Sequence, residues 1–203
     1  MPRILSRLEF VDMPWKNGRG HTSEIFRIDA NGRMVFRISS AEVSASGEFS
    51  DFSDYDRSLV NIGAGEMFLT HGETSVSSHG EPLLPLGVAH FDGGIRTHCR
   101  VSEATRDLNI FCDRNTYFAS TVVRTLITPE FLPVPALSNT FIFVVTGSLV
   151  VQNIDKIQFF VQQGDAVLHE SQPTLQQDRW MLASASNFPC VVVTVVFRNA
   201  ASD

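Results

Sequence analysis

The 203-residue sequence contains no cluster of basic residues and no long apolar run. Its 16 Lys and Arg residues are outnumbered by 22 Asp and Glu residues, which gives a net charge of −6. A protein surface that follows nucleic-acid phosphates needs clustered Lys and Arg, so we expect no nucleic-acid partner. A membrane-spanning helix needs about 20 apolar residues, so we expect no membrane association. Charges at Arg3, Arg7 and Asp12 also interrupt any signal-peptide core.

Paired cysteines are absent as well. Cys99, Cys112 and Cys190 are isolated, and no two of them form a C-x-x-C motif. An odd number of unpaired cysteines does not suggest a disulfide framework or a zinc site. Free, buried thiols in a reducing compartment are the simplest interpretation, and we expect a cytoplasmic protein.

Motifs for metal binding and nucleophilic catalysis are also missing. The six histidines form no H-x-H, H-x-x-x-H or H-E-x-x-H pattern, although ligands from separate strands could still converge. There is no G-x-S-x-G elbow, and no cysteine has an electropositive context that would lower its pKa. Gly18-Arg19-Gly20 is too short for a dinucleotide fingerprint. We therefore expect no metal and no cofactor.

Short β-rich segments and glycine turns make up most of the chain. No amphipathic helix of ordinary length is present, and this pattern is typical of an all-β sandwich or barrel. The expected strands include residues 3–10, 34–43, 95–101, 107–111, 121–127 and 190–197. Two further pairs of strands are expected to form hairpins, 59–62 with 66–70 around Gly65, and 141–145 with 149–152 around Gly147.

The two expected hairpins indicate an internal repeat. Gly65 and Gly147 lie at matching places, and Gly87 and Gly164 lie in the turns that follow. Two rough copies of one all-β unit therefore account for the chain. We place the N-terminal unit at residues 1–115 and the C-terminal unit at residues 116–203, packed together as one compact molecule.

Polar and charged residues gather on or beside the expected strands of the N-terminal half. They are Glu24, Arg37, Arg57, Arg100, Asp107 and Asn109, and Lys16 and Asn17 lie on the loop that leads in. Arginine can hold a carboxylate through two parallel hydrogen bonds, and asparagine can donate and accept at once. Such a set could bind a small acid with a nitrogenous end. Alternatively, Arg57 and Asp107 form a structural ion pair and the other side chains are solvated.

At these residues the sequence resembles the HutD/Ves family. The resemblance rests on three blocks in one order: Met13-Pro14-Trp15-Lys16-Asn17-Gly18 with Thr22 and Glu24; Gly47-Glu48-Phe49-Ser50 with Phe52 and Tyr55-Asp56-Arg57; and Arg106-Asp107-Leu108-Asn109. The chain departs from the family pattern at Arg19 and Leu108, where glycine and phenylalanine are common, and at Ser53-Asp54, where Pro-Gly is common. No histidine lies between Gly47 and Gly65, where cupin metal enzymes generally carry a pair.

The resemblance implies a bicupin, two cupin-like β-barrel units in one chain. It also implies a bacterial protein that is associated with histidine utilisation and senses or limits the flux of an intermediate. The expected ligand is a small carboxylate such as urocanate or a formimino- or formylglutamate, bound without catalysis. The matching motif residues are the expected ligand-binding set: Trp15, Lys16, Asn17, Thr22, Glu24, Arg57, Asp107 and Asn109.

Within that set, Arg57 or Lys16 is expected to hold the carboxylate, and Trp15 to supply an apolar wall. Asn17, Asn109 and Glu24 would contact the nitrogenous end. Two alternatives remain open. Glu24 or Asp107 could act as a general acid or base in an enzyme, or a barrel face could make the protein an interaction module, with a homodimer as one such assembly.

Overall fold

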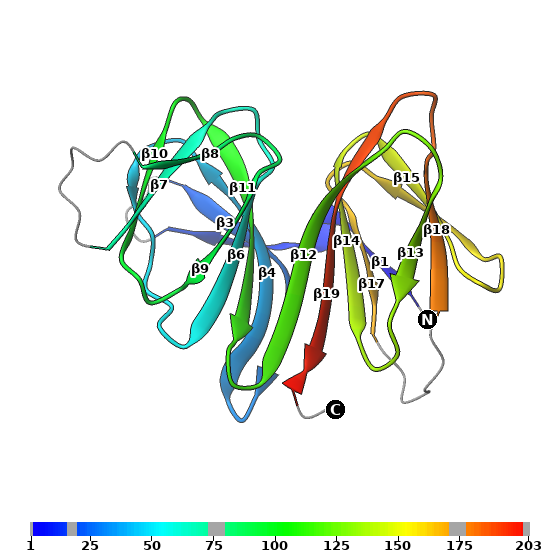
Figure 1. The fold of residues 1–203 in the computed structure, drawn as a ribbon, viewed down its shortest axis with the longest axis horizontal. Helices are drawn as coiled ribbons and strands as arrows, with labels where there is room; N and C mark the ends of the chain where they lie inside the picture. Colours follow the sequence, from blue (N-terminus) through cyan, green and yellow to red (C-terminus); the bar gives the residue numbers. More distant parts are fainter. Residues whose placement is uncertain (1, 16–19, 73–79, 171–177, 201–203) are drawn as a thin grey trace. The chain divides into compact units, whose positions relative to one another are not determined.

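The computed structural model describes residues 2–15, 20–72, 80–170 and 178–200, and almost all of its regular structure is β-strand (Figure 1). The 3-10 segment Arg7–Glu9 is an exception. The all-β prediction is confirmed. In this part of the chain no helix is long and apolar enough to span a membrane.

The first unit spans Phe10–Tyr117 and consists of two sheets. The larger sheet has six strands in the order β2 (Val11–Pro14), β3 (His21–Ala30), β4 (Arg33–Val43), β11 (Thr105–Asp113), β6 (Tyr55–Asn61) and β9 (Val88–Asp92). The smaller sheet has the order β5 (Gly47–Glu48), β10 (Thr97–Val101), β7 (Met67–His71) and β8 (Glu81–Leu83). The apolar core of this unit includes Leu59, Met67 and Cys99.

The second unit joins Met1–Glu9 to Phe118–Asp203. Its larger sheet runs β1 (Arg3–Leu5), β17 (Ala166–His169), β14 (Asn139–Thr146), β19 (Cys190–Asn199) and β12 (Tyr117–Leu126). Its smaller sheet runs β13 (Glu130–Val134), β18 (Asp178–Ser184), β15 (Ser148–Gln152) and β16 (Gln158–Gln162). Its core contains the fully buried Trp180.

The sheet orders support the predicted repeat. Strands β4 to β11 recur as β12 to β19 with the same neighbours, so β4-β11-β6-β9 matches β12-β19-β14-β17. Likewise β5-β10-β7-β8 matches β13-β18-β15-β16. The two units are therefore copies of one topology, and strands β1, β2 and β3 lie outside the repeat.

Both predicted hairpins are wrong. Strands β6 and β7 belong to different sheets, as do β14 and β15, so each glycine turn is a corner between two sheets. Gly63 shows why such a corner needs glycine, since a Cβ there would lie 2.3 Å from the Thr105 Oγ1 atom of β11. A glycine-rich break between two apolar segments looks the same in sequence whether the next strand pairs with the last one or crosses to the facing sheet.

The first strand is another difference from the sequence prediction. It ends at Leu5 rather than near Phe10, and it pairs with β17, placing Arg3 opposite Leu168. The predicted unit 1–115 included this strand, whereas the structure groups it with the C-terminal residues. A three-residue strand carries no sequence signal for a partner more than 160 positions away. The prediction of free, buried cysteines is confirmed for Cys99, Cys112 and Cys190.

Candidate functional site

The register of the six-stranded sheet gathers the polar residues onto one face. Asp107 of β11 pairs with Ala41 of β4, and Asn109 pairs with Ser39. Two residues beyond Asn109 on β11, Phe111 lies opposite Arg37 of the neighbouring strand β4. On its other side, Phe111 lies opposite Arg57 of β6. Side chains of a strand alternate between the two faces, so residues two apart share a face. The sheet therefore carries a continuous row of polar and aromatic side chains.

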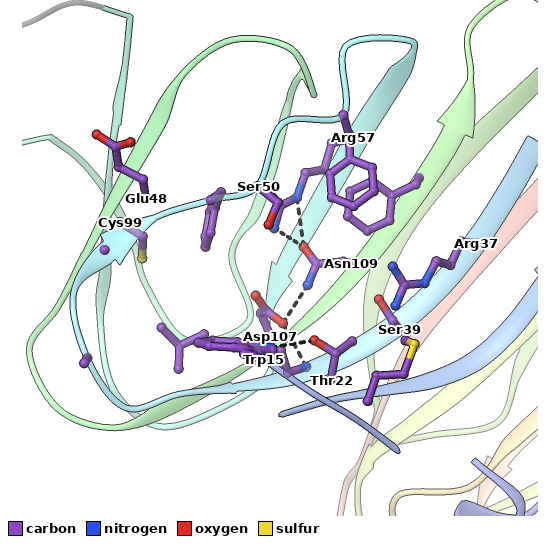
Figure 2. Close-up of a pocket in the computed structure, with 18 of the residues that line it drawn as sticks. Trp15, Thr22, Arg37, Ser39, Glu48, Ser50, Arg57, Cys99, Asp107 and Asn109 are labelled. Carbon is purple, nitrogen blue, oxygen red and sulfur yellow. Dashed lines mark hydrogen bonds between the residues drawn. The ribbon is translucent and has the colours of Figure 1, made fainter. Parts of the chain in front are cut away.

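This face forms the floor of a cavity of about 850 Å³ within the first unit (Figure 2). Residues 45–50, including Glu48, Phe49 and Ser50, line another part of the cavity, and Met13, Pro14 and Trp15 also contribute. Cys99 of β10 lines it from the smaller sheet. A pocket of this size, mainly apolar with a few convergent polar groups, suits a small ligand.

A hydrogen-bonded chain of three buried side chains lies in the cavity (Figure 2). The Arg57 Nε atom donates to Asn109 Oδ1 at 2.9 Å, and Arg57 Nη2 donates to the same oxygen. Asn109 Nδ2 donates to Asp107 Oδ1 at 2.6 Å, which also accepts from the Ala41 backbone N–H at 3.0 Å. Among the residues that the structure describes, Arg57 and Asp107 form no direct ion pair, so the alternative of a simple structural pair is wrong. Asn109 separates the two charges.

Arg57 is held by aromatic rings as well as by Asn109. Its guanidinium carbon lies 4.1 Å from the centre of the Phe49 ring, 5.2 Å from Phe111 and 5.3 Å from Phe91. The side chain is 6% exposed. Burial lowers the pKa of Arg57 to about 10, while the nearby Asp107 opposes that shift. Arg57 therefore stays protonated at neutral pH, and its charge is shielded from water.

Asp107 is 1% exposed, and its pKa shifts in the direction opposite to that of Arg57. Burial raises the pKa of Asp107, while Arg57, Asn109 and the Ala41 amide all oppose the rise. Nearby Cys99 has its thiol pKa raised to about 12, mainly by burial and then by Asp107. Cys99 is therefore a neutral thiol, which does not suit a nucleophile.

The raised pKa of Asp107 predicts a pH-dependent stability. Between its unfolded and folded pKa values, the folded chain keeps a proton on Asp107 that the unfolded chain has lost. The free energy of unfolding should therefore fall as pH rises from about 4 through the raised pKa, by about 1.4 kcal/mol for each pH unit between those two values. Urea unfolding of the wild type and Asp107→Asn from pH 4 to 8 measures this. The wild type should lose stability relative to the variant as pH rises, and parallel curves would contradict the prediction.

Trp15 and Thr22 complete one end of the cavity. The Trp15 indole N–H donates to Thr22 Oγ1 at 2.9 Å, and the Trp15 backbone N–H donates to the Gly20 carbonyl at 2.9 Å. A Cβ at Gly20 would lie 3.1 Å from the Trp15 ring, so the close approach favours glycine there. These contacts place the indole as an apolar wall.

The structure brings together five of the eight predicted ligand-binding residues. Trp15, Thr22, Arg57, Asp107 and Asn109 all line the cavity. Lys16 and Asn17 lie outside the described residues. Glu24 is not a lining residue, and its Oε2 atom lies 2.9 Å from Arg37 Nε.

Histidines do not line this cavity in the described part of the chain. His71 contacts Thr97 through Nδ1 at 2.9 Å, and His90 contacts Ser58 at 2.8 Å. The described residues also contain no group of three His, Cys, Asp or Glu side chains that could hold a metal ion.

Comparison with known proteins agrees with the motif blocks. The sequence model of HutD matches residues 7–183 of this chain. The chain belongs to the HutD family. A curated relative, an uncharacterised 21.2 kDa protein in the hutC 3′ region of Pseudomonas putida, is 36% identical over 112 residues. That alignment spans 53% of this chain and 56% of the relative, so the chain covers only about half of that protein.

Solved structures, one of them a HutD protein, share the fold. HutD from Pseudomonas fluorescens, solved in a formate condition, is 25% identical with a TM-score of 0.78, and the match covers 98% of this chain and 99% of that one. A conserved protein of unknown function from Pseudomonas aeruginosa is 24% identical with a TM-score of 0.85, at the same coverage. A cupin 2 conserved barrel protein from Leptotrichia buccalis is 10% identical with a TM-score of 0.56, covering 96% and 95%. The predicted cupin-type fold is confirmed.

Several lining residues of this HutD-family cavity were missing from the predicted set. They include Arg37, Ser39, Phe49, Cys99 and Phe111. The sequence did contain a signal for some of them, since every second residue of a strand lies on the same face. Residues 37, 39, 41 and 43 of β4 and residues 107, 109 and 111 of β11 line the cavity in this way. Arg100, another candidate strand charge, instead stacks on Phe68 with its guanidinium carbon 4.0 Å from the ring centre, and it is exposed.

Proposed function

We propose that the chain binds a small carboxylate-bearing intermediate of histidine utilisation in the cavity of its first unit, without transforming it. Urocanate and formimino- or formylglutamate are the candidate ligands. The HutD family and the relative from the hutC region support the pathway. In this proposal the protein senses or limits the flux of that intermediate in the cytoplasm, where its three thiols would remain reduced.

The observation that carries this proposal is the buried Arg57 guanidinium. All hydrogen bonds from Arg57 to described residues go to the neutral Asn109. No carboxylate among the described residues forms a direct ion pair with Arg57. A desolvated cation without a direct counter-ion favours an anionic ligand. Arginine is also suited to hold a carboxylate through two parallel bonds.

The rest of the cavity fits the remainder of such a ligand. Trp15 and Phe49 offer apolar surface on which a planar or aliphatic body can lie. Asp107 offers a carboxyl group, which can accept a hydrogen bond from an N–H group at the nitrogenous end. Glu24 does not fit the role predicted for it, because it contacts Arg37 and lies outside the cavity lining.

A thermal-shift screen of the metal-stripped protein tests this function. The panel contains urocanate, formimino- and formylglutamate, plain carboxylates that include formate, and divalent metals. A ligand at 100 times its dissociation constant should stabilise the fold by about 2.7 kcal/mol. A shift with a pathway intermediate and none with metals is the expected result. A shift with metals alone would contradict the proposal.

Acid–base catalysis is the second candidate function, because Asp107 is a buried carboxyl group on the cavity wall with a raised pKa. A carboxyl group with a raised pKa can act as a general acid or base toward a bound ligand. Incubating the purified protein with the same intermediates and following product formation tests this. Turnover that is lost in Asp107→Asn would replace the binding function with an enzymatic one.

A further inference from the structure

The cavity contains a second shielded cation, Arg37. Its side chain is 12% exposed, and its guanidinium carbon lies 5.8 Å from the centre of the Phe111 ring, while that of Arg57 lies 5.2 Å from the same ring. Both arginines line the cavity. In Figure 2 the guanidinium end of Arg37 points toward the space beside Asn109 and Ser39. The two cations therefore flank one aromatic ring on the cavity floor.

The shortest contact between Glu24 and Arg37 is at the Nε atom of the guanidinium. Glu24 Oε2 lies 2.9 Å from Arg37 Nε, but neither atom has a hydrogen bond of acceptable geometry. The same carboxylate oxygen also lies 3.9 Å from Arg27 Nη1, so its charge is shared between two arginines. Among the described residues, none forms a hydrogen bond with the Nη1–Nη2 edge of Arg37. That edge can hold a carboxylate through two parallel bonds.

We propose that Arg37 holds a second carboxylate, so that the ligand of this cavity is a small dicarboxylate whose acid groups reach Arg57 and Arg37. The inference rests on the proposed carboxylate-binding function and narrows its ligand class. Asn109 and Ser39 face each other two residues along from the Phe111–Arg37 pair, on the same face of the sheet, where they can contact the polar middle of the ligand. A formyl- or formiminoglutamate has two carboxylates and fits, whereas urocanate has one and does not.

Charge in the cavity is consistent with a dianion. Arg37 and Arg57 bring two positive charges to the lining, Glu24 lies beside Arg37 from outside the lining, and Asp107 is a lining carboxyl group of the same row. Burial raises the pKa of Asp107 and thus favours its neutral form, and a nearby dianion would favour that form further. Glu48, the other lining acid, is paired with Arg96.

A matched ligand pair tests this inference by isothermal titration calorimetry on the full chain. N-formyl-L-glutamate and N-formyl-L-glutamine differ only in whether the distal group is a carboxylate or a neutral amide. The wild type should prefer the diacid by about tenfold or more, as expected for a hydrogen bond between charged groups. Arg37→Gln should remove that preference and change the affinity for the amide by about twofold or less.

Two further variants separate a ligand contact from a structural role. Arg37→Gln combined with Glu24→Gln removes both charges, so no carboxylate is left without its partner, and the preference should still be lost. Arg27→Gln changes the other arginine near Glu24, which is not a lining residue, and should keep the preference. Equal binding of the two ligands by the wild type, or a preference that survives Arg37→Gln, would overturn the dicarboxylate inference alone. Binding of neither ligand, nor of any other carboxylate, would overturn the proposed function as well.

A separate observation concerns the outer face of the smaller sheet in the second unit. Strand alternation places Phe131, Val150, Phe160 and Met181 on this face, opposite the buried Leu132, Leu149, Val161 and Trp180. Phe131 is 63% exposed and Phe160 is 61% exposed. The outward positions of these four strands include no carboxylate, and their one cation, Arg179, stacks on Phe131 at 5.3 Å.

The repeat supplies an internal comparison. On the corresponding sheet of the first unit, the outward positions include His98 opposite Glu48, and Arg100 opposite Phe68. That face carries charge of both signs, whereas its counterpart in the second unit carries mainly apolar and amide side chains. The shared topology therefore does not require the apolar character of this face, and an exposed apolar patch often marks an interaction site.

We infer that this face binds a second copy of the chain. The chain has a net charge of −6, so two copies repel each other over most acidic surfaces. A face without carboxylates allows two copies to meet without contacts between acidic groups. A symmetric dimer places the same patch on both partners, which an apolar surface satisfies without complementary charges.

Analytical ultracentrifugation tests the dimer. The wild type should sediment as a dimer, and Phe131→Asp with Phe160→Asp should sediment as a folded monomer because it places buried, unpaired charges in the interface. Phe188→Asp changes an exposed phenylalanine outside this face, which is 77% exposed, and should remain dimeric. A monomeric wild type would mean that something other than a second copy covers the face, and would overturn the inference, as would a dimer that survives the double substitution.

Discussion

Arg57→Met should weaken the binding of any carboxylate ligand by about 2–5 kcal/mol, which is the range for losing one partner of a buried charged contact. Methionine keeps a long, unbranched side chain among Phe49, Phe91 and Phe111, so the loss would reflect the charge rather than a large cavity. Calorimetric titration with formylglutamate, or with the best ligand of the thermal-shift screen, measures the change. The fold should be retained, because the variant removes a cation that is costly to bury.

Arg100→Met is the matched control for that experiment. Arg100 also stacks on a phenylalanine, with its guanidinium carbon 4.0 Å from Phe68 against 4.1 Å for Arg57 on Phe49. It is exposed and does not line the cavity. The control should bind ligand like the wild type. Unchanged affinity in Arg57→Met would remove Arg57 as the carboxylate anchor, and equal losses in both variants would point to a nonspecific charge effect.

Asn109→Leu should have the largest effect on stability. Asn109 accepts from Arg57 and donates to Asp107, so a leucine of similar size leaves two buried polar groups without the partner that separates them. Each unsatisfied group costs about 1–3 kcal/mol, and charged groups cost more. We expect the free energy of unfolding to fall by about 3–5 kcal/mol, as measured by the urea midpoint in the absence of ligand.

A triple variant separates the hydrogen-bond network from simple packing. Replacing Arg57, Asn109 and Asp107 together by methionine, leucine and leucine removes every charge along with the group that joined them. Replacing a whole buried polar network by apolar residues is often neutral or stabilising, so the triple variant should recover most of the lost stability. It should not bind carboxylates. If Asn109→Leu is as stable as the wild type, the network does not stabilise the fold.

Local patterns in the sequence were enough to predict the all-β class and the strand at residues 34–43, which the structure places at Arg33–Val43. The turn glycines revealed the repeat, since matching corners recur in both units. The motif blocks also led to the family and to five of the cavity residues. These features depend on neighbours close in sequence, where period, turn chemistry and composition carry the information.

Residues with distant partners were predicted less well. Glu24 matched a family motif and was expected to contact the ligand, but the β3–β4 register pairs it with Ser39, and its side chain meets Arg37. Arg37 was recognised as a charged strand residue but was absent from the predicted ligand-binding set, although it lines the cavity. Whether a charge on a strand faces a ligand or a partner depends on the pairing of two strands, which neither strand encodes alone.

The sequence by itself determined that this chain is β-structured, internally repeated, free of disulfides and related to HutD, because composition and short-range patterns decide each of these. Only the tertiary structure decided that Asn109 joins Arg57 to Asp107, and that Arg37 shares the Phe111 ring with Arg57. It also placed β1 with β17, and it made the glycine turns corners between sheets. The physical reason is that strand register and sheet crossing set the contacts between residues far apart in the chain, and those contacts also set the burial that shifts their pKa values.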